Sequence, residues 1–209
     1  MVERRGRGRP KETDTDTSAA ISRAALQRFA AQGFEATSLR EIAADAGVDV
    51  ALISYRFGGK LGLWKAIVSQ SGLDLRDVLE RAVEGIDEDD AQARLDRSAR
   101  AFLAHLLERP EVPKLLLRDI TVNGDRSQWL LETLSMPLHR RFVRLAQAAA
   151  EKRPTPPAHL EFKVASFIYA AASSVARRDR LGKLIDGIDS DAEFAAALEA
   201  TLIEGPLAP

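Results

Sequence analysis

Cysteine is absent from the 209 residues, which excludes disulfide bonds and cysteine–zinc sites and agrees with a reducing compartment. The chain also lacks an apolar run of about 18 residues, the length of a membrane span. Its N-terminus is charged throughout and does not resemble a secretory signal. The formal net charge is −1, so binding to a polyanion would require a local basic patch. We therefore expect a cytoplasmic protein with no membrane partner.

The residues that are abundant favour helices. Hydrophobic residues make up 45% of the chain, a fraction typical of a soluble globular protein with a substantial core. Alanine and leucine are prominent, and runs of β-branched residues are few. This balance predicts an all-α fold.

Residues 37–57 predict two short helices joined by a glycine turn. In the first helix, apolar residues recur at i, i+3, i+4 and i+7, which is one helical face. Thr37 or Ser38 supplies the N-cap oxygen, and Glu41 completes a capping-box pattern with Ser38. Gly47 ends the helix, because glycine accepts a positive φ without a Cβ clash. The apolar face consists of Leu39, Ile42, Ala43 and Ala46.

The second of these helices is predicted to begin after Asp49, which is placed to cap it. Its buried side would be Val48, Ile53 and Phe57. Two short helices joined in this way form a helix-turn-helix, whose second helix lies in the DNA major groove. Just before them, residues 15–32 predict a supporting helix that completes a three-helix unit.

The first residues of the chain, 1–16, are polar and basic, and we expect them to form a flexible arm. The run Arg7-Gly8-Arg9-Pro10 resembles an AT-hook, a segment that lies in the minor groove of A·T-rich DNA. Arginines suit that narrow, electronegative groove, and a glycine lets the backbone approach it. The alternative is a solubilising tail. Beside a helix-turn-helix, Arg7 and Arg9 are better explained as DNA contacts.

These residues together resemble the DNA-binding domain of TetR-family (TetR/AcrR-like) transcriptional regulators over residues 17–65. The resemblance implies an all-helical homodimer, usually a repressor, whose C-terminal domain binds a small ligand and releases DNA. It does not reach the C-terminal two thirds of the chain. The matching residues are Ile21, Ala24, Ala25, Phe29, Gly33, Phe34, Thr37, Leu39, Ile42, Ala43, Ala46, Gly47, Val48, Ile53, Ser54, Tyr55, Phe57, Lys60 and Leu63.

The second helix leaves a short, mostly apolar face for DNA. By the resemblance, the positions that face the major groove are Val50, Ala51, Leu52, Ser54 and Arg56, and Tyr55 contacts the sugar–phosphate backbone. Val50 and Ala51 cannot hydrogen-bond a base, but they can pack on thymine methyl groups. Arg56 is the one long donor on this face. The alternative for Val50 and Leu52 is an ordinary core position.

Phosphate contacts are expected where helices begin. Lys60 follows two glycines at the start of the fourth helix, a natural phosphate site. A nucleotide-binding loop is excluded there, because the required spacing and the preceding strand are missing. Thr37, Ser38 and Arg40 occupy another helix start and are predicted to contact phosphate as well.

The rest of the chain predicts further helices, for about nine in all. Pro137 must kink or split the segment 125–152. Small residues crowd the segment 160–180, and with the last helix, 190–203, this suggests a self-complementary surface. The alternative is an intramolecular core. The predicted dimer contacts are Ala170, Ser173, Ser174, Phe194, Leu198 and Leu202.

A ligand pocket is expected between the long C-terminal helices, although each candidate is more often a plain core residue. The candidate lining residues are Phe102, His105, Trp129, Phe142, Phe167 and Tyr169. The three histidines lack metal-ligand spacing, and no catalytic grouping is recognisable, so we predict no enzyme, cofactor or metal. A helical-bundle enzyme is the alternative class that this argues against.

The predicted organisation is an arm at 1–16, a helix-turn-helix domain at 17–60 and a helical effector-binding and dimerisation domain at 61–209. The hypothesis is a dimeric repressor that a small molecule releases from a palindromic DNA operator. The alternatives are an architectural protein that binds A·T-rich DNA and a transcriptional activator of the same fold.

Overall fold

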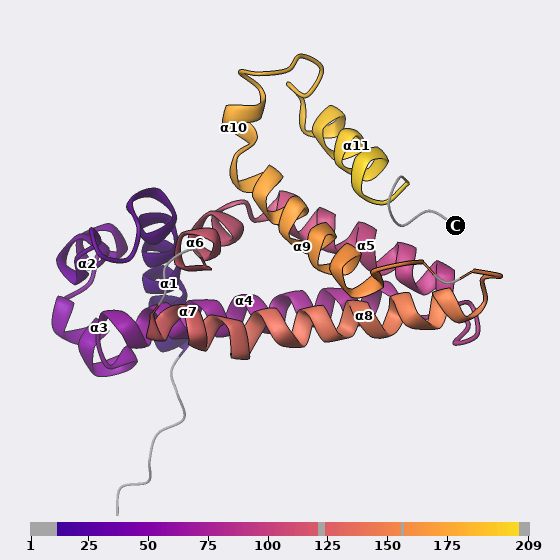
Figure 1. Ribbon diagram of the computed structural model, residues 1–209. Helices are drawn as coiled ribbons and strands as arrows, with labels where there is room; N and C mark the ends of the chain where they lie inside the picture. The colour runs from indigo at the N-terminus through magenta and orange to yellow at the C-terminus, as the bar shows by residue number, and fades with distance from the viewer. Residues whose placement is uncertain (1–11, 121–123, 156, 205–209) are drawn as a thin grey trace, which may run out of the picture. The chain divides into compact units, whose positions relative to one another are not determined.

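The computed structural model describes residues 12–120, 124–155 and 157–204 (Figure 1). These residues form helices and no β-strand, which confirms the all-α prediction. The bounds are α1 Glu12–Gln32, α2 Leu39–Ala46, α3 Val50–Phe57, α4 Lys60–Ala82, α5 Ala91–Glu108, α6 Glu111–Ile120, α7 Asp125–Leu130, a π-helical turn Leu131–Ser135, α8 Met136–Glu151, α9 Leu160–Ala176, α10 Arg178–Leu181 and α11 Asp191–Leu202.

The chain divides into two compact units, residues 1–67 and 68–209. The boundary lies inside α4, later than the expected position at residue 60. The first turns of α4 belong to the N-terminal unit because Leu63 and Trp64 are fully buried there. Trp64 meets Phe34 edge to face, with ring centroids 6.5 Å apart. At the other end, α1 begins at Glu12, so residues 12–16 are helical and do not belong to the arm.

The caps predicted for α2 and α3 are present. The Oγ of Ser38 accepts from the backbone N–H of Glu41, and the Glu41 carboxylate accepts from the backbone N–H of Ser38 at 2.8 Å. Gly47 has φ 66°, and Asp49 accepts from the Ala51 N–H at 2.7 Å. Each bond satisfies an N–H that the helix itself leaves unpaired. Local chemistry therefore determines where α2 and α3 begin.

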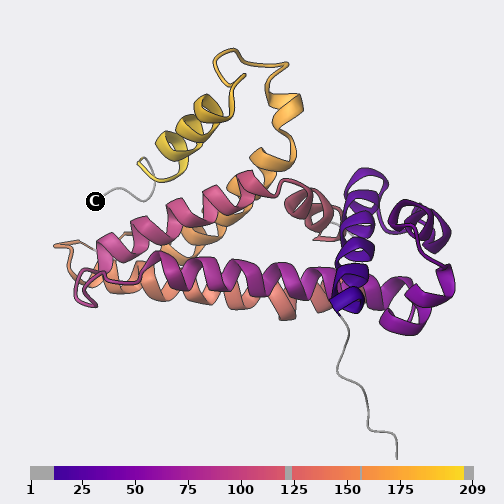
Figure 2. The same cartoon turned by 180° about the vertical axis from the view of Figure 1, so that it is seen from behind.

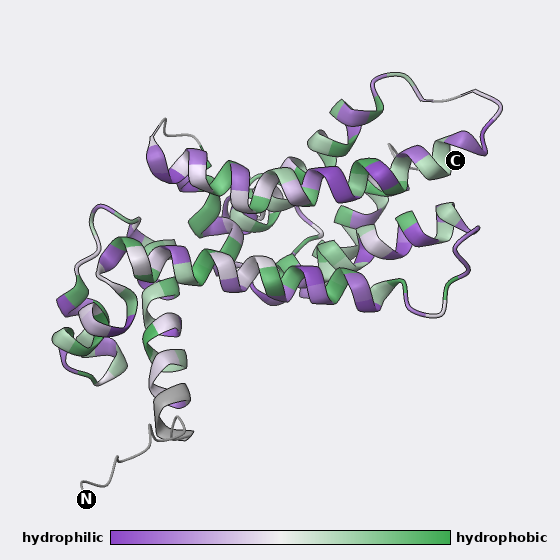
Figure 3. Ribbon diagram, turned by 90° about the horizontal axis from the view of Figure 1, so that it is seen from below, coloured by the Kyte–Doolittle hydropathy of each residue, from purple (hydrophilic) through white to green (hydrophobic). Residues whose placement is uncertain are grey.

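The C-terminal unit is built around three phenylalanines from three helices. Phe102 of α5, Phe142 of α8 and Phe167 of α9 have ring centroids 5.6–5.8 Å apart. Their helices pack on one another, α6 packs on α9, and α11 packs on α5 and α9 (Figure 2). Hydrophobic and hydrophilic residues alternate in bands along the helices, as amphipathic packing requires (Figure 3).

The burial of α11 corrects part of the predicted dimer surface. Phe194 is 2% exposed and Leu198 is 6% exposed, and both belong to the core of their own unit. The guanidinium of Arg178 lies 4.9 Å from the centroid of the Phe194 ring. The prediction that Phe194 and Leu198 contact a second copy is therefore wrong.

Pro137 is accommodated without a break in the helix. Residues 125–151 are helical throughout, and the π-helical turn immediately precedes the proline. In this turn the N–H of Met136 bonds to the carbonyl of Leu131, five residues back. Such a turn changes the local hydrogen-bond pattern before a residue that has no N–H to donate.

None of the helices in the described ranges combines the length and the hydropathy that a bilayer-spanning segment needs.

We predict that Phe142→Ala destabilises the C-terminal unit by about 3–5 kcal/mol, because it opens a cavity in the aromatic cluster. Urea unfolding followed by circular dichroism measures the loss. Phe142→Leu, which keeps most of the apolar volume, is the matched control and should lose much less. Equal losses for the two variants would contradict the proposed packing role of the ring.

Candidate nucleic-acid interface and C-terminal pocket

Helix α3 is attached to the N-terminal unit by one side only. Ile53 is fully buried, whereas Val50, Ala51 and Ser54 are exposed. Tyr55 is 88% exposed, which is unusual for an aromatic side chain on a short, well-capped helix. The exposed residues thus form a surface that a partner could cover.

Two other residues expected on this surface are more enclosed. Leu52 is half-buried, so its assignment to the groove or to the core stays open. Arg56 is half-buried as well, and its Nη1 donates to Ser18 Oγ of α1 at 2.6 Å. In this structure Arg56 ties α3 to α1. Its contact with DNA stays a prediction.

The start of α2 separates into buried and exposed groups. The Thr37 side chain is 1% exposed and donates to the Gly33 carbonyl at 2.7 Å, so the predicted phosphate contact by this side chain is wrong. Ser38 is exposed but engaged in the capping box, whose hydrogen bonds lower the pKa of Glu41. Arg40 is exposed on the first turn of α2, in a position that a phosphate could reach.

Lys60 organises the turn between α1 and α2. Its ammonium donates to the carbonyls of Phe34 at 2.9 Å, Glu35 at 3.3 Å and Thr37 at 2.9 Å. The same nitrogen lies 4.5 Å from the centroid of the Phe34 ring. An ammonium has three N–H donors, and these three acceptors can engage all of them. The predicted phosphate contact by Lys60 is untested, but this geometry favours a positioning role.

Gly62, which the sequence did not single out, holds α4 close to the end of α3. A Cβ added to Gly62 would lie 1.7 Å from the carbonyl oxygen of Phe57. No side chain fits at that distance, so the backbones approach as closely as they do only because residue 62 is glycine. The orientation of α3 therefore depends on the first turns of α4.

Helices α1 and α2 are joined by an arginine that forms ion pairs with two carboxylates. Arg28 contacts Asp45 through Nε at 2.5 Å and through Nη2 at 2.9 Å, which is a bidentate pair. Its Nη1 lies 3.4 Å from Glu41. The hydrogen bond from Arg28 lowers the pKa of Asp45, so this carboxylate is ionised at neutral pH. Arg7 and Arg9, which complete the predicted DNA surface, lie outside the described residues.

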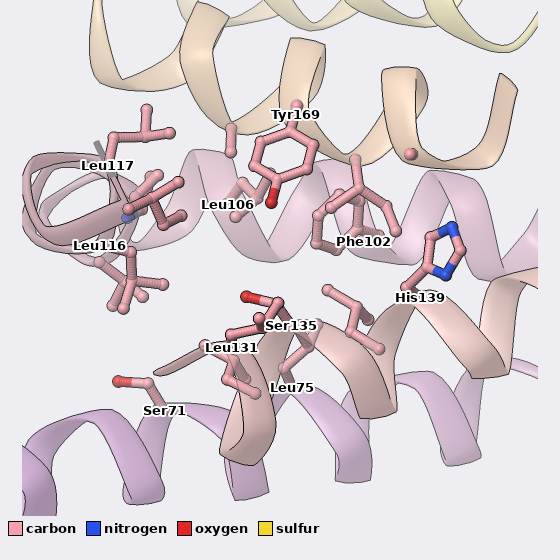
Figure 4. Close-up of a pocket in the computed structure, with 18 of the residues that line it drawn as sticks. Ser71, Leu75, Phe102, Leu106, Leu116, Leu117, Leu131, Ser135, His139 and Tyr169 are labelled. Carbon is pink, nitrogen blue, oxygen red and sulfur yellow. The ribbon is translucent and has the colours of Figure 1, made fainter. Parts of the chain in front are cut away.

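The C-terminal unit contains a pocket of about 230 Å³, which is partly open because Leu131 and Tyr169 of its wall are exposed (Figure 4). It is bounded by α4, α5, α6, the π-helical turn with the start of α8, and α9. Figure 4 shows the hydroxyl groups of Tyr169 and Ser135 directed toward the space between α9 and α8. Leucines supply much of the wall: Leu75, Leu106, Leu116, Leu117, Leu131, Leu134 and Leu138.

The pocket contains only some of the side chains predicted to line it. Phe102, His105 and Tyr169 are part of its wall. Phe142 and Phe167 are core residues instead, because their rings are buried in the aromatic cluster. Trp129, on α7, is not among the described residues that line the pocket. The periodicity of the helices marked these aromatics as buried but could not distinguish a pocket wall from a close-packed core.

Helix α9 also has an exposed apolar face on its other side. Phe162 is 74% exposed, and the helical spacing from it continues through Ser166 and Ala170 to Ser173. Together with Leu202 of α11, the first three of these residues line a shallow hollow. The predicted dimer contacts Ala170, Ser173, Ser174 and Leu202 are all partly exposed, so they remain available to a partner. Phe162 was missed because one exposed aromatic has no signature in the sequence.

The geometry of residues 12–67 is that of a helix-turn-helix domain, the class of fold that places one helix in a DNA groove. Residues 21–67 match the family model described as bacterial regulatory proteins, tetR family. This match confirms the resemblance inferred from the sequence, and it extends over the DNA-binding unit.

Comparison with individual proteins agrees with this. The chain is 29% identical over 133 residues to a probable HTH-type transcriptional regulator, YttP, of Bacillus subtilis (strain 168), and the match spans 64% of each chain. A TetR-like transcriptional regulator from Rhodococcus sp. RHA1 has a similar structure, with a TM-score of 0.69 at 18% identity, over 97% of this chain and all 100% of that one. The fatty acid degradation regulator FadR from Bacillus halodurans also has a similar structure, with a TM-score of 0.71 at 13% identity. The match covers 95% of this chain and 98% of that one. The family model describes regulatory proteins and YttP is named as a probable regulator, which supports the prediction that the chain is not an enzyme. The two solved structures support the fold.

We predict that Lys60→Met lowers the free energy of unfolding of the N-terminal unit by about 2 kcal/mol, since it removes charged hydrogen bonds to three carbonyls. Lys60→Arg should recover only part of the loss, because a planar fork cannot place its donors as an ammonium does. Urea unfolding monitored by Trp64 fluorescence in a Trp129→Phe background measures the effect.

Arg40→Met is the matched control for Lys60→Met, as it removes one exposed positive charge from the same unit. It should leave stability unchanged and reduce the salt dependence of DNA binding by about one unit of log K per log salt. A Lys60→Met protein of normal stability that shows this same salt effect would mean that Lys60 is an ordinary phosphate contact.

Proposed function

We propose that the chain is a ligand-responsive DNA-binding transcriptional regulator, in its simplest form a dimeric repressor that leaves a palindromic operator when a small molecule binds. The observation that carries this proposal is the exposed face of α3. The helix is capped by Asp49 and held by Ile53, and its free side presents Val50, Ala51 and Ser54. A short, well-capped helix with one exposed face suits insertion into the major groove.

The chemistry of this face favours methyl contacts over hydrogen bonds. Val50 and Ala51 can pack on thymine methyl groups, and Ser54 can hydrogen-bond either kind of base edge. Tyr55 is 88% exposed, which supports the proposal that it contacts the sugar–phosphate backbone. Sequence preference would then depend partly on the arm, where Arg7 and Arg9 suit an A·T-rich minor groove.

A dimer would overcome the small reach of α3. Its eight residues span about 12 Å and can contact only a few base pairs. Two copies with recognition helices about 34–36 Å apart can read both halves of a palindrome. The face of α9 that begins at Phe162 is the surface we propose for pairing, because an exposed phenylalanine beside small residues allows close helix packing.

Release would follow from ligand binding in the pocket of the C-terminal unit. Leu75 of α4 lines this pocket. The first turns of the same helix carry Lys60, which contacts the α1–α2 turn, and Gly62, which lies against the end of α3. A ligand that favours one arrangement of α4 would change the fit of α3 to DNA. By linkage, DNA must then weaken ligand binding by the same factor.

Two alternatives predict different binding patterns. An architectural protein would bind many A·T-rich sequences with similar affinity, whereas a regulator would select one or a few sites. An activator of the same fold would bind its site equally well but raise transcription. FadR is named for the regulation of fatty acid degradation, but at 13% identity the likeness extends to the fold alone and assigns no ligand to this chain.

We expect the full chain to select a small number of palindromic sites from genomic DNA, with affinity that falls steeply as salt rises. Selection followed by mobility shift at several salt concentrations measures both properties. Val50→Asp should abolish selective binding while the fold is retained, since residue 50 is exposed. Uniform affinity for all A·T-rich fragments would contradict the regulator and favour the architectural alternative.

Phe162→Asp is expected to give a folded monomer whose operator affinity falls at least tenfold, because the buried charge would oppose pairing. Light scattering coupled to gel filtration reports the mass. The matched control is Leu184→Asp, which changes another strongly exposed apolar residue, outside α9. If Phe162→Asp remained dimeric and bound DNA normally, the pairing surface would have to lie elsewhere.

A further inference from the structure

The pocket of the C-terminal unit is lined by apolar side chains and by neutral polar ones. Among the described residues that form its wall there is no lysine, arginine, aspartate or glutamate. Leucines, Phe102 and Val112 supply most of the surface, and the polar groups are hydroxyls and two imidazoles. An ion moved from water into such a wall would lose its hydration and gain no countercharge, which is costly.

One polar atom of this wall lacks a partner. His105 is 5% exposed, and no described residue hydrogen-bonds its Nε2. Burial, together with the positive charge of Arg109, lowers the pKa of His105, so its imidazole is neutral at pH 7. A buried polar atom left without a hydrogen bond costs about 1–3 kcal/mol. A ligand with one suitable polar group would remove that cost.

The other polar groups of the wall differ from Nε2 of His105. His139 Nε2 lies 3.2 Å from the carbonyl of Glu161, so it already has a hydrogen-bond partner. The hydroxyls of Ser135 and Tyr169, seen in Figure 4, can act as donor or acceptor and would adapt to a ligand. Nε2 of His105 is thus the buried side-chain atom of this wall that has no hydrogen-bond partner among the described residues.

The volume indicates the size of the molecule, or part of a molecule, that this pocket can hold. An engineered cavity of about 150 Å³ in another protein holds benzene, with its six carbons. By proportion, about 230 Å³ accommodates roughly nine non-hydrogen atoms.

We infer that this pocket takes an uncharged, mostly apolar molecule of about nine non-hydrogen atoms, whose single polar group hydrogen-bonds Nε2 of His105. Medium-chain alcohols, ketones and lactones, and small alkylphenols, belong to this class. Carboxylates, quaternary amines and phosphorylated thioesters do not. The inference rests on the proposed function only in treating the pocket as the effector site.

The first test uses three probes with the same eight-carbon chain on the full-length protein without DNA: 1-octanol, octanoate and octylammonium. Calorimetry at pH 7.5 should show 1-octanol binding at least tenfold more tightly than either ion. Octanoate or octylammonium binding as well as the alcohol would overturn the inference. Failure of all three to bind would overturn it too.

The second test assigns the polar group to His105. His105→Leu should weaken 1-octanol about tenfold but leave propylbenzene, which has no hydrogen-bonding group, unchanged or slightly tighter. His105→Gln keeps a hydrogen-bonding side chain and should retain most of the affinity for 1-octanol. Equal losses for both probes in His105→Leu would mean that the imidazole only supports the wall.

The control variant is His159→Asn, which changes a histidine outside this pocket. Residue 159 has φ 56°, a backbone conformation that asparagine accepts. The affinity of the His159→Asn variant for 1-octanol should equal that of the unchanged protein. Melting curves confirm that each variant folds.

The effector role is tested separately, by adding the bound probe to a protein–operator complex. Binding of 1-octanol without any loss of operator affinity would refute the effector role and leave the ligand class intact. Absence of operator binding would refute the proposed function, and the calorimetric result would still stand or fall on its own.

Discussion

The ammonium of Lys60 is the interaction on which the DNA-binding unit depends most. It joins the first residue of α4 to three carbonyls of the α1–α2 turn and covers the ring of Phe34. That turn leads directly into the capping box of α2, and Gly62 brings α4 against the end of α3. The exposed face of α3 is therefore positioned by residues that do not themselves lie on it.

Much of this unit could be predicted from the sequence because its signals are local. Ser38, Glu41, Gly47 and Asp49 act within a few residues of their own positions, and the structure has each in its expected role. Arginines and threonines were less predictable. Thr37 carries a side chain suited to phosphate but turns inward, since the Gly33 carbonyl accepts its hydroxyl. Whether a polar group faces a partner or its own backbone depends on tertiary contacts that spacing does not encode.

In the C-terminal unit the sequence predicted helices but not their neighbours. Phe142 and Phe194 have the periodicity of a buried face, and that periodicity is the same for a pocket, a dimer interface and an intramolecular core. Only the packing of α5, α8, α9 and α11 decides among them. Gly62 illustrates the same limit. Position 62 has no room for a Cβ because α4 lies against the end of α3, and that contact cannot be read from the sequence.

The π-helical turn before Pro137 affects how the shape of the pocket can change in evolution. A wider turn holds one residue more than the α-helix around it, and each residue in a helix rotates the chain by about 100°. We expect loss of a single residue here to convert the turn to regular α-helix and to rotate its side chains, Leu131 and Leu134 among them, relative to the cavity. A single deletion can thus reshape this wall by a larger step than most substitutions allow.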